Sequence, residues 1–235
     1  MTATTTDACG WLASLLQTAD SFYPTGAYAH SFGLEGLVQS GAVRDCATLQ
    51  AFIVGQALPS LARTDLPIAA QAWAASGNPP DWGRLRELSF LGAAVRGARE
   101  PREASESIGR QRIELAARLH GGFAAEFAIR AREGGWPASA GMASAIEGRS
   151  HGAPCEAVLS ASIYSTAAGL VAAAIKLLRL GQNAAQAVLR EALAGSPALI
   201  VRAMSAGPGE VGSFNPWWEI AAARHESADG RMFIS

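Results

Sequence analysis

The side chains best suited to chemistry cluster near the start of the chain, between residues 20 and 35. A Pro-Thr-Gly turn is followed there by aromatic, imidazole and carboxylate groups, carried by Pro24, Gly26, Tyr28, His30, Ser31 and Glu35. Catalysis requires a nucleophile, a base and an orienting group within mutual reach. His30 and Ser31 are adjacent, so on a helix their side chains point about 100° apart and cannot form a nucleophile–base pair. Glu35 could act as an acid or base only with a partner that the sequence does not identify.

Two further patterns could indicate nucleotide binding, but neither has the required context. Residues 207–212 match G-x-G-x-x-G, which binds dinucleotides when it follows a strand and opens a helix. Here a helical segment precedes it, and Pro208 removes a backbone donor that a phosphate would need. A P-loop requires Gly-Lys followed by Ser or Thr, whereas the sole lysine, Lys176, lies between Ile and Leu. The sequence therefore argues against ATP or GTP binding by either motif.

The histidines and cysteines form no recognisable metal motif. His225-Glu226 begins like the zinc-protease helix His-Glu-x-x-His, but Asp229 occupies the second histidine position, and a catalytic zinc takes three protein ligands. The other histidines stand far apart, at 30, 120 and 151. We therefore expect no built-in metal site and no cofactor. A site that takes one histidine from each of two chains remains an alternative.

The composition is that of a folded protein. Of 235 residues, 49% are hydrophobic and 17% charged, and the formal net charge is -1. A disordered chain shows the opposite balance, and a nucleic-acid-binding domain is usually basic. The 3 cysteines are widely spaced, which fits a reducing compartment, and the N-terminus lacks the features of a signal peptide. We expect a cytoplasmic protein that does not bind nucleic acid.

Helical periodicity dominates the chain. Ala, Leu, Arg, Gln and Glu fill long segments, and alternating β-branched runs are almost absent. The pattern predicts an all-α fold, a single-domain bundle of about ten to twelve helices over 1-235, with flexible tails at 1–8 and 228–235. Helices are expected at 10–19, 27–40, 46–62, 65–76, 81–98, 102–120, 123–133, 138–148, 155–180, 183–194, 196–205 and 217–227. Ser40-Gly41, Gly121-Gly122 and Gly181 are expected to end helices.

The segment 155–180 is predicted to be the central helix. Between Ala157 and Ile175 it has 19 residues without a charge, which is close to the length that spans a bilayer. Alanine dominates the segment, and Ser160, Ser162, Tyr164, Ser165 and Thr166 are polar, so it is less apolar than a typical span. A helix that is small or apolar all round also suits a buried core position. We therefore expect no membrane span.

Two of the predicted helices carry a distinct polar face. In 27–40, the residues at helical spacing divide into a core stripe and an aromatic–acidic face of the kind found at interfaces. The first set is Ala27, Ser31, Leu34 and Val38, and the second is Tyr28, Phe32, Glu35 and Gln39. Burial of both faces against different helices is the alternative. In 102–120, the charged residues, including Arg112, are expected to form a solvated face with i,i+4 pairs.

Several segments, taken together and in order, resemble the urease accessory protein UreF family. Residues 24–35, Pro-Thr-Gly-Ala-Tyr-Ala-His-Ser-Phe-Gly-Leu-Glu, resemble its N-terminal signature. Residues 174–182, Ala-Ile-Lys-Leu-Leu-Arg-Leu-Gly-Gln, resemble its Lys-Leu-Val-Pro-Leu-Gly-Gln segment. Arg-His-Glu at 224–226 and Arg-Met-Phe-Ile-Ser at 231–235 resemble its C-terminal ending. The resemblance spans nearly the whole chain.

The resemblance implies an all-helical, homodimeric chaperone that is not itself an enzyme. Such a protein joins a UreD/UreH-type accessory protein and the GTPase UreG, recruits and regulates that GTPase, and serves nickel insertion into apo-urease. Tyr28 and Arg231 match positions implicated in gripping the GTPase, and Glu35 and Lys176 match positions implicated in controlling it. Supporting positions are Pro24, Gly26, His30, His225, Glu226 and Phe233. Arg179 stands where proline is usual, so we expect the central helix to end less abruptly.

Two alternatives stay open at this point. One is a helical enzyme that uses Glu35 and His30 in a cleft, which requires a deep pocket holding both groups. The other is a relative within the same family that serves a different nickel enzyme.

Overall fold

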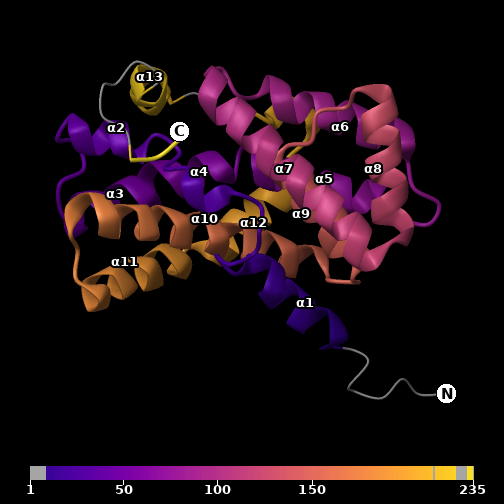
Figure 1. The fold of residues 1–235 in the computed structure, drawn as a ribbon, viewed down its shortest axis with the longest axis horizontal. Helices are drawn as coiled ribbons and strands as arrows, with labels where there is room; N and C mark the ends of the chain where they lie inside the picture. Colours follow the sequence, from indigo (N-terminus) through magenta and orange to yellow (C-terminus); the bar gives the residue numbers. More distant parts are fainter. Residues whose placement is uncertain (1–8, 214, 226–231, 235) are drawn as a thin grey trace.

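The chain folds into a helical bundle without a strand in the residues that the computed structural model describes, 9–213, 215–225 and 232–234 (Figure 1). The helices are α1 Gly10–Ala19, α2 Leu34–Gln39, α3 Cys46–Phe52, α4 Leu58–Leu61, α5 Asp65–Ala75, α6 Trp82–Ala94, α7 Arg99–His120, α8 Gly122–Gly134, α9 Ala140–Ser150, α10 Cys155–Leu178, α11 Gln182–Ala194, α12 Ser196–Ser205 and α13 Pro216–His225. Shorter helical turns are η2 Ala27–Ala29, η3 Ile53–Ala57 and η4 Pro208–Glu210. The predicted all-α class is confirmed. The tails predicted at 1–8 and 228–235 fall outside the described residues except for 232–234.

Helix α10 is the central element, as its composition predicted. It packs against α1, α2, α4, α5, α9, α11 and α12, and it runs across the middle of the bundle in Figure 1. Leu159, Ile163 and Ala167 are completely buried along it. Within the described residues it is the one helix long and apolar enough to cross a membrane, but 44% of its apolar window is buried inside the bundle. Its packing is that of a core helix.

A buried ion pair holds the segment before η2 against the bundle. The Glu147 carboxylate, on α9, is wholly buried and accepts hydrogen bonds from the Tyr23 hydroxyl and from Nε of Arg112, on α7. Arg112 also donates to the backbone carbonyl of Thr18 at 3.3 Å. Burial, and then the bond to Glu147, raise the pKa of Tyr23, so it stays protonated and donates. The expectation that Arg112 lies on a solvated face is therefore wrong.

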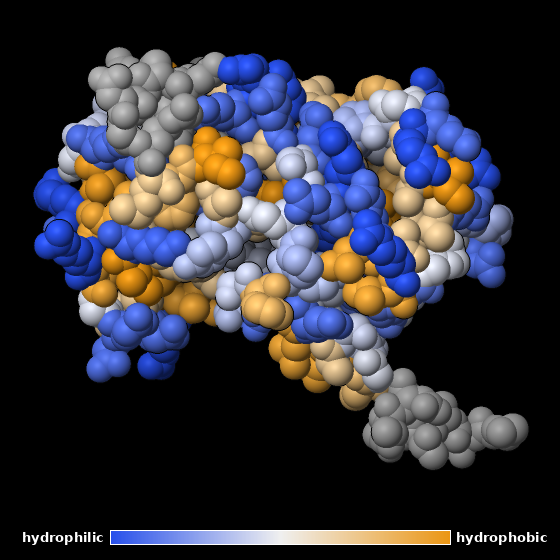
Figure 2. Space-filling view, viewed as in Figure 1, coloured by the Kyte–Doolittle hydropathy of each residue, from blue (hydrophilic) through white to orange (hydrophobic). Residues whose placement is uncertain are grey.

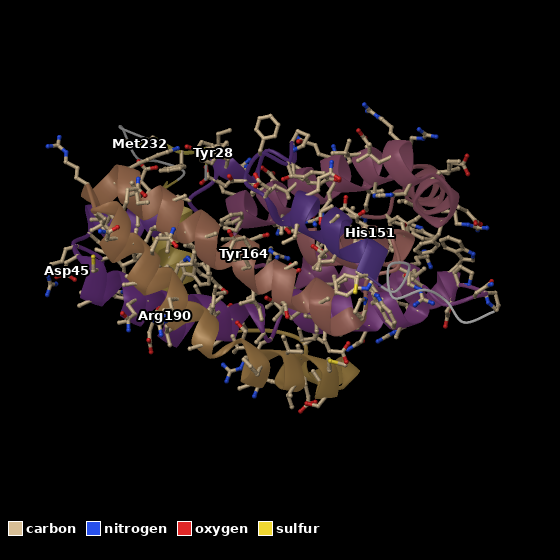
Figure 3. The ribbon with its side chains drawn as sticks, turned by 90° about the horizontal axis from the view of Figure 1, so that it is seen from below. Tyr28, Asp45, His151, Tyr164, Arg190 and Met232 are labelled. Carbon is tan, nitrogen blue, oxygen red and sulfur yellow. The ribbon has the colours of Figure 1, made fainter. Side chains whose placement is uncertain are left out.

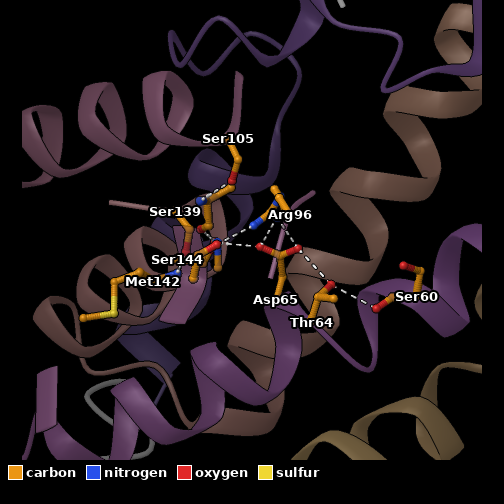
Figure 4. Close-up of polar contacts among 11 residues, drawn as sticks. Ser60, Thr64, Asp65, Arg96, Ser105, Ser139, Met142 and Ser144 are labelled. Carbon is orange, nitrogen blue, oxygen red and sulfur yellow. Dashed lines mark hydrogen bonds and ion pairs between the residues drawn. The ribbon is translucent and has the colours of Figure 1, made fainter. Parts of the chain in front are cut away.

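A second buried pair fastens α6 to α5 and α9. The Arg96 guanidinium donates to both carboxylate oxygens of Asp65, at 2.6 and 2.5 Å (Figure 4). The Gly141 amide and the Thr64 hydroxyl, both at 3.3 Å, also donate to this carboxylate. Arg96 bonds the Gly92 carbonyl at 3.0 Å as well. Because both carboxylate oxygens and both terminal guanidinium nitrogens have partners, the burial of the pair between three helices is tolerated.

The prediction of one continuous helix over 27–40 is wrong, because the chain leaves the helical conformation between η2 and α2. The turn η2 is followed by His30 in an extended conformation and then by Phe32 and Gly33 with φ of 51° and 82°. Two successive residues with positive φ cannot continue a right-handed helix, so α2 begins only at Leu34. The predicted division of this helix into a core stripe and an aromatic–acidic face is therefore also wrong, because it assumed one continuous helix. Glu35 is buried, at 3% exposure, on the same short helix as the buried Leu34.

The end of α10 also differs from expectation. The helix stops at Leu178, and Arg179 takes the left-handed conformation at the C-cap, with φ of 52°. Gly181, which was expected to end this helix, has φ of -69° and is the N-cap of α11. The helix therefore ends sharply, and the expectation of a less abrupt end is wrong. An L-residue in this conformation is strained, which is why glycine is the usual choice.

We predict that Arg179→Gly stabilises the protein. Removing the Cβ from a left-handed position should raise the free energy of unfolding by about 1 kcal/mol. Urea denaturation followed by far-UV circular dichroism measures the change. The matched control is Arg190→Gly inside α11, an exposed position where glycine should lower stability by about 0.5–1 kcal/mol. A loss of stability in both variants would contradict the strain at Arg179.

We predict that Glu147→Ala is strongly destabilising, because it leaves the Arg112 guanidinium buried without its carboxylate. The expected loss in the free energy of unfolding is about 3–5 kcal/mol, against about 1 kcal/mol for Tyr23→Phe, which removes a single hydrogen bond. The double variant Arg112→Met with Glu147→Leu serves as the control. It should recover most of the loss, since it removes both charges together. Equal losses in the single and the double variant would argue against an uncompensated charge.

Candidate partner-docking site

The structure brings together four of the residues singled out in the sequence, from distant parts of the chain. Tyr28 lies on η2, Glu35 on α2, Lys176 on α10 and Phe233 in the C-terminal segment. Figure 3 shows Tyr28 and Met232 on the same edge of the molecule. We call residues 232–234, with the groups that hold them, the tail clasp.

Glu35 is the centre of the tail clasp. One carboxylate oxygen accepts a hydrogen bond from the Met232 amide at 2.8 Å, and the other from the Phe233 amide at 3.1 Å. The Ile234 amide donates to the Ala29 carbonyl at 2.8 Å, so the segment is tied to both η2 and α2. Hydrogen bonds to an ionised acceptor are the stronger kind. Glu35 thus works inside the protein rather than on an exposed face.

Lys176 connects this clasp to the surface. Its ammonium nitrogen lies 3.7 Å from the ring centroid of Tyr28 and 5.4 Å from that of Phe233, both within the range of a cation–π interaction. Tyr28 is 58% exposed and Lys176 is also exposed, whereas Phe233 is buried. The cation therefore bridges a buried ring and an exposed one. Of the four residues brought together here, Tyr28 and Lys176 are the exposed ones and can contact a partner.

Helix α13 holds the same region from another side. The Trp218 indole N–H donates to the carbonyl of Phe32 at 2.7 Å, and its ring packs edge-on against Phe52. A Cβ on Gly36 would lie 2.7 Å from the carbonyl oxygen of Ala221, so α2 and α13 are in close backbone contact. Trp218 thereby fixes the strained turn that follows η2. Sequence reasoning missed this role, although Asn215-Pro216 signals the helix start that places Trp218.

A cavity of about 440 Å³ opens beside the site. Its walls come from the segment around Tyr23 and His30, from the buried pair Asp65–Arg96 and from Trp218. Several wall hydroxyls donate to backbone carbonyls: Ser162 to Val158, Ser165 to Ala19, and Ser144 to Ala140. These hydroxyls are thus already bonded within the protein.

The cavity does not supply the arrangement that the enzyme alternative requires. His30 lines it, and burial lowers the pKa of His30, opposed by the Glu100 carboxylate. The Glu35 carboxylate, however, faces the tail amides and is not part of the cavity wall. In the described part of the chain, the two groups therefore do not share one pocket.

The remaining sequence candidates add little to the site. Pro24 and Gly26 form the exposed turn before η2, where Gly26 has φ of 78°. In the 207–212 loop, the Gly207 amide donates to the carboxylate of Glu210 at 2.7 Å. That amide is therefore already used, in agreement with the prediction against a phosphate loop. Outside the described residues lie Glu226, Arg231 and the side chain of His225.

Exposed apolar side chains surround the site. Met232 and Ile234 are 62% and 65% exposed, and Phe22 is 92% exposed on the loop before η2. Figure 2 shows apolar side chains among charged ones on the face that carries α10. Apolar groups gathered on a surface with polar neighbours are typical of protein–protein contacts. The arrangement suits docking of a protein partner.

We predict that Glu35→Gln loosens the tail clasp without unfolding the bundle. Each charge-assisted bond is worth about 1.5–3 kcal/mol, so the Met232 and Phe233 amides should exchange with solvent at least about tenfold faster. Hydrogen–deuterium exchange followed by NMR measures the rates. The control Glu126→Gln alters an exposed acid paired with Arg130 and should leave the exchange of the tail amides unchanged. Unchanged exchange in Glu35→Gln would show that the carboxylate does not hold the tail.

Comparisons with known proteins show the family to which the chain belongs. A family model described as UreF matches residues 43–193. The urease accessory protein UreF of Paracidovorax citrulli is 33% identical over 95% of this chain and 90% of its own length. That of Methylibium petroleiphilum is 34% identical over 95% and 94%. A bifunctional urease accessory protein UreEF of Bordetella bronchiseptica is 34% identical over 96% of this chain, which spans 52% of that protein. The chain therefore belongs to the UreF family of urease accessory proteins.

Proposed function

We propose that this chain is a non-enzymatic adaptor in the nickel-dependent maturation of urease. In this proposal it acts as a cytoplasmic homodimer, binds a UreD/UreH-type protein, and recruits and regulates the GTPase UreG. The assembled complex then inserts nickel into apo-urease. Membership of the UreF family supports the general role, and the relatives named above are themselves called urease accessory proteins.

The observation that carries the proposal is the exposed pair of Tyr28 and Lys176 on a rigid base. Tyrosine is enriched at the energetic centres of interfaces, and here a cation lies 3.7 Å from its ring centroid. The base beneath is fixed by the Glu35 bonds to the tail at 2.8 and 3.1 Å. A preorganised site loses little entropy when a partner binds. Tyr28 and Lys176 would contact the GTPase directly, and Glu35 would act by holding the tail in place.

The distribution of charges also favours an adaptor over an enzyme. The buried acids Glu147 and Asp65 are paired with arginines, and Glu35 bonds backbone amides. Catalysis needs a group that is left available to react, whereas these groups are occupied in holding helices together. GTP hydrolysis would then take place on the partner, with this chain supplying the surface that positions it.

We predict that Tyr28→Ala reduces recovery of the GTPase at least about tenfold, because a residue at the energetic centre of the interface is lost. The measurement is co-purification after the chain is co-expressed with UreG and a UreD/UreH-type partner. Lys176→Ala should act in the same direction. The matched control is Tyr164→Ala, which removes another exposed tyrosine ring, 42% accessible, from α10. It should leave recovery of the GTPase unchanged.

The tail provides a second arm of the same experiment. Arg231→Ala alone should weaken recruitment, and the double variant Tyr28→Ala with Arg231→Ala should abolish it. Circular dichroism must show the same helix content as for the unaltered chain. An intact assembly with the double variant would reject this docking site, even though membership of the family would stand.

A further inference from the structure

The fold brings together two histidines that are far apart in the sequence. His120 is the last residue of α7, and His151 is the C-cap of α9. Their ring centroids are 5.5 Å apart, with the ring planes inclined at 53°. Figure 3 labels His151, which lies far from Tyr28 and Met232. The two imidazoles are therefore separate from the docking site.

The nitrogens of His151 lack partners within the described part of the chain. Both Nδ1 and Nε2 are buried without a hydrogen bond, and among the described side chains only the Ser89 hydroxyl shares this condition. A buried polar group left unsatisfied costs about 1–3 kcal/mol. Such a group in a native protein calls for an explanation, and an ion is one of the usual ones. One ring nitrogen of His151 therefore has a lone pair that no hydrogen-bond donor of the described residues occupies.

The surroundings of the two rings favour a cation. Helices α7 and α9 pack together and both end here, and each helix carboxyl end carries about half a negative charge. Glu147 lies one turn before His151, and the nearby Arg112 is paired with that carboxylate. A neutral imidazole offers the lone pair of one ring nitrogen to a metal.

We propose that His120 and His151 together bind one divalent cation of intermediate softness, such as Ni²⁺, Zn²⁺ or Cu²⁺. Imidazole suits these metals, whereas Mg²⁺ and Ca²⁺ prefer oxygen ligands. No group of three metal-binding side chains occurs in the described residues. The two imidazoles therefore supply only part of the coordination shell, and other ligands must complete it. The inference rests on the two rings and their surroundings, and it does not depend on the proposed adaptor role.

Isothermal titration of the full chain, prepared without a histidine tag, tests the site. Ni²⁺ and Zn²⁺ should each bind with a stoichiometry of one per chain. His120→Gln and His151→Gln should each lower the affinity for the metal at least about tenfold. Loss of a residue that only hydrogen-bonds a metal ligand already lowers metal affinity by about that factor. The matched control is His30→Gln, because His30 is also half-buried with a pKa lowered by burial. It should leave the affinity for the metal unchanged.

NMR of the unaltered chain tests the site independently of the variants, in case His151→Gln disturbs folding. Paramagnetic Ni²⁺ should broaden the imidazole NMR signals of His120 and His151 in the unaltered chain and leave those of His30 sharp. Absence of binding, or equal binding by the unaltered chain and a folded His120→Gln variant, would overturn the proposal. Broadening confined to other histidines would do the same. None of these measurements uses a partner protein, so failure here leaves the recruitment experiment intact.

Discussion

A carboxylate that is removed from water needs hydrogen-bond donors. Glu35 obtains them from the backbone amides of Met232 and Phe233, near the C-terminus of the chain. Isolated burial of such a charge would cost several kcal/mol. The two tail amides at 2.8 and 3.1 Å are therefore a condition for α2 to pack as it does. Because amides come from fixed positions in the backbone, they also set the register of the tail. That register places Phe233 beneath Lys176 and thereby positions the exposed Tyr28.

A second constraint acts on the same few residues from the side of α13. The backbone at Phe32 has a positive φ, a strained conformation that persists only when its surroundings enforce it. The Trp218 indole supplies that enforcement by bonding the Phe32 carbonyl at 2.7 Å. Helix α2 is thus held by the tail through Glu35 and by α13 through Trp218. The loop that carries Tyr28 lies just before this helix and is therefore anchored close to both contacts.

Most of the fold could be predicted from the sequence, because helical periodicity is a local signal. The central position of segment 155–180 could also be predicted, because a helix of small and apolar residues without charges suits a buried position. The break after η2 could not be predicted, since residues 27–40 look helical locally and Trp218, which stabilises the turn, is distant in the chain. Arg112 was misassigned because nothing local reveals its partner Glu147. Glu35 and Lys176 were singled out by family resemblance, but their opposite exposures follow only from the fold.

The charged groups of this protein divide into those that fix its shape and those that remain available. Glu147, Asp65 and Glu35 are buried and bonded, and they determine where α7, α9 and the tail lie. The Lys176–Tyr28 pair is exposed, where a cation–π interaction is worth about 0.5–1 kcal/mol, rising to about 2 kcal/mol when water is excluded. A partner that covers Tyr28 would therefore strengthen the contact between Lys176 and the ring. Through Phe233 it would also strengthen the hold on the tail. Binding at the surface and order in the C-terminal segment are thus coupled through one cation.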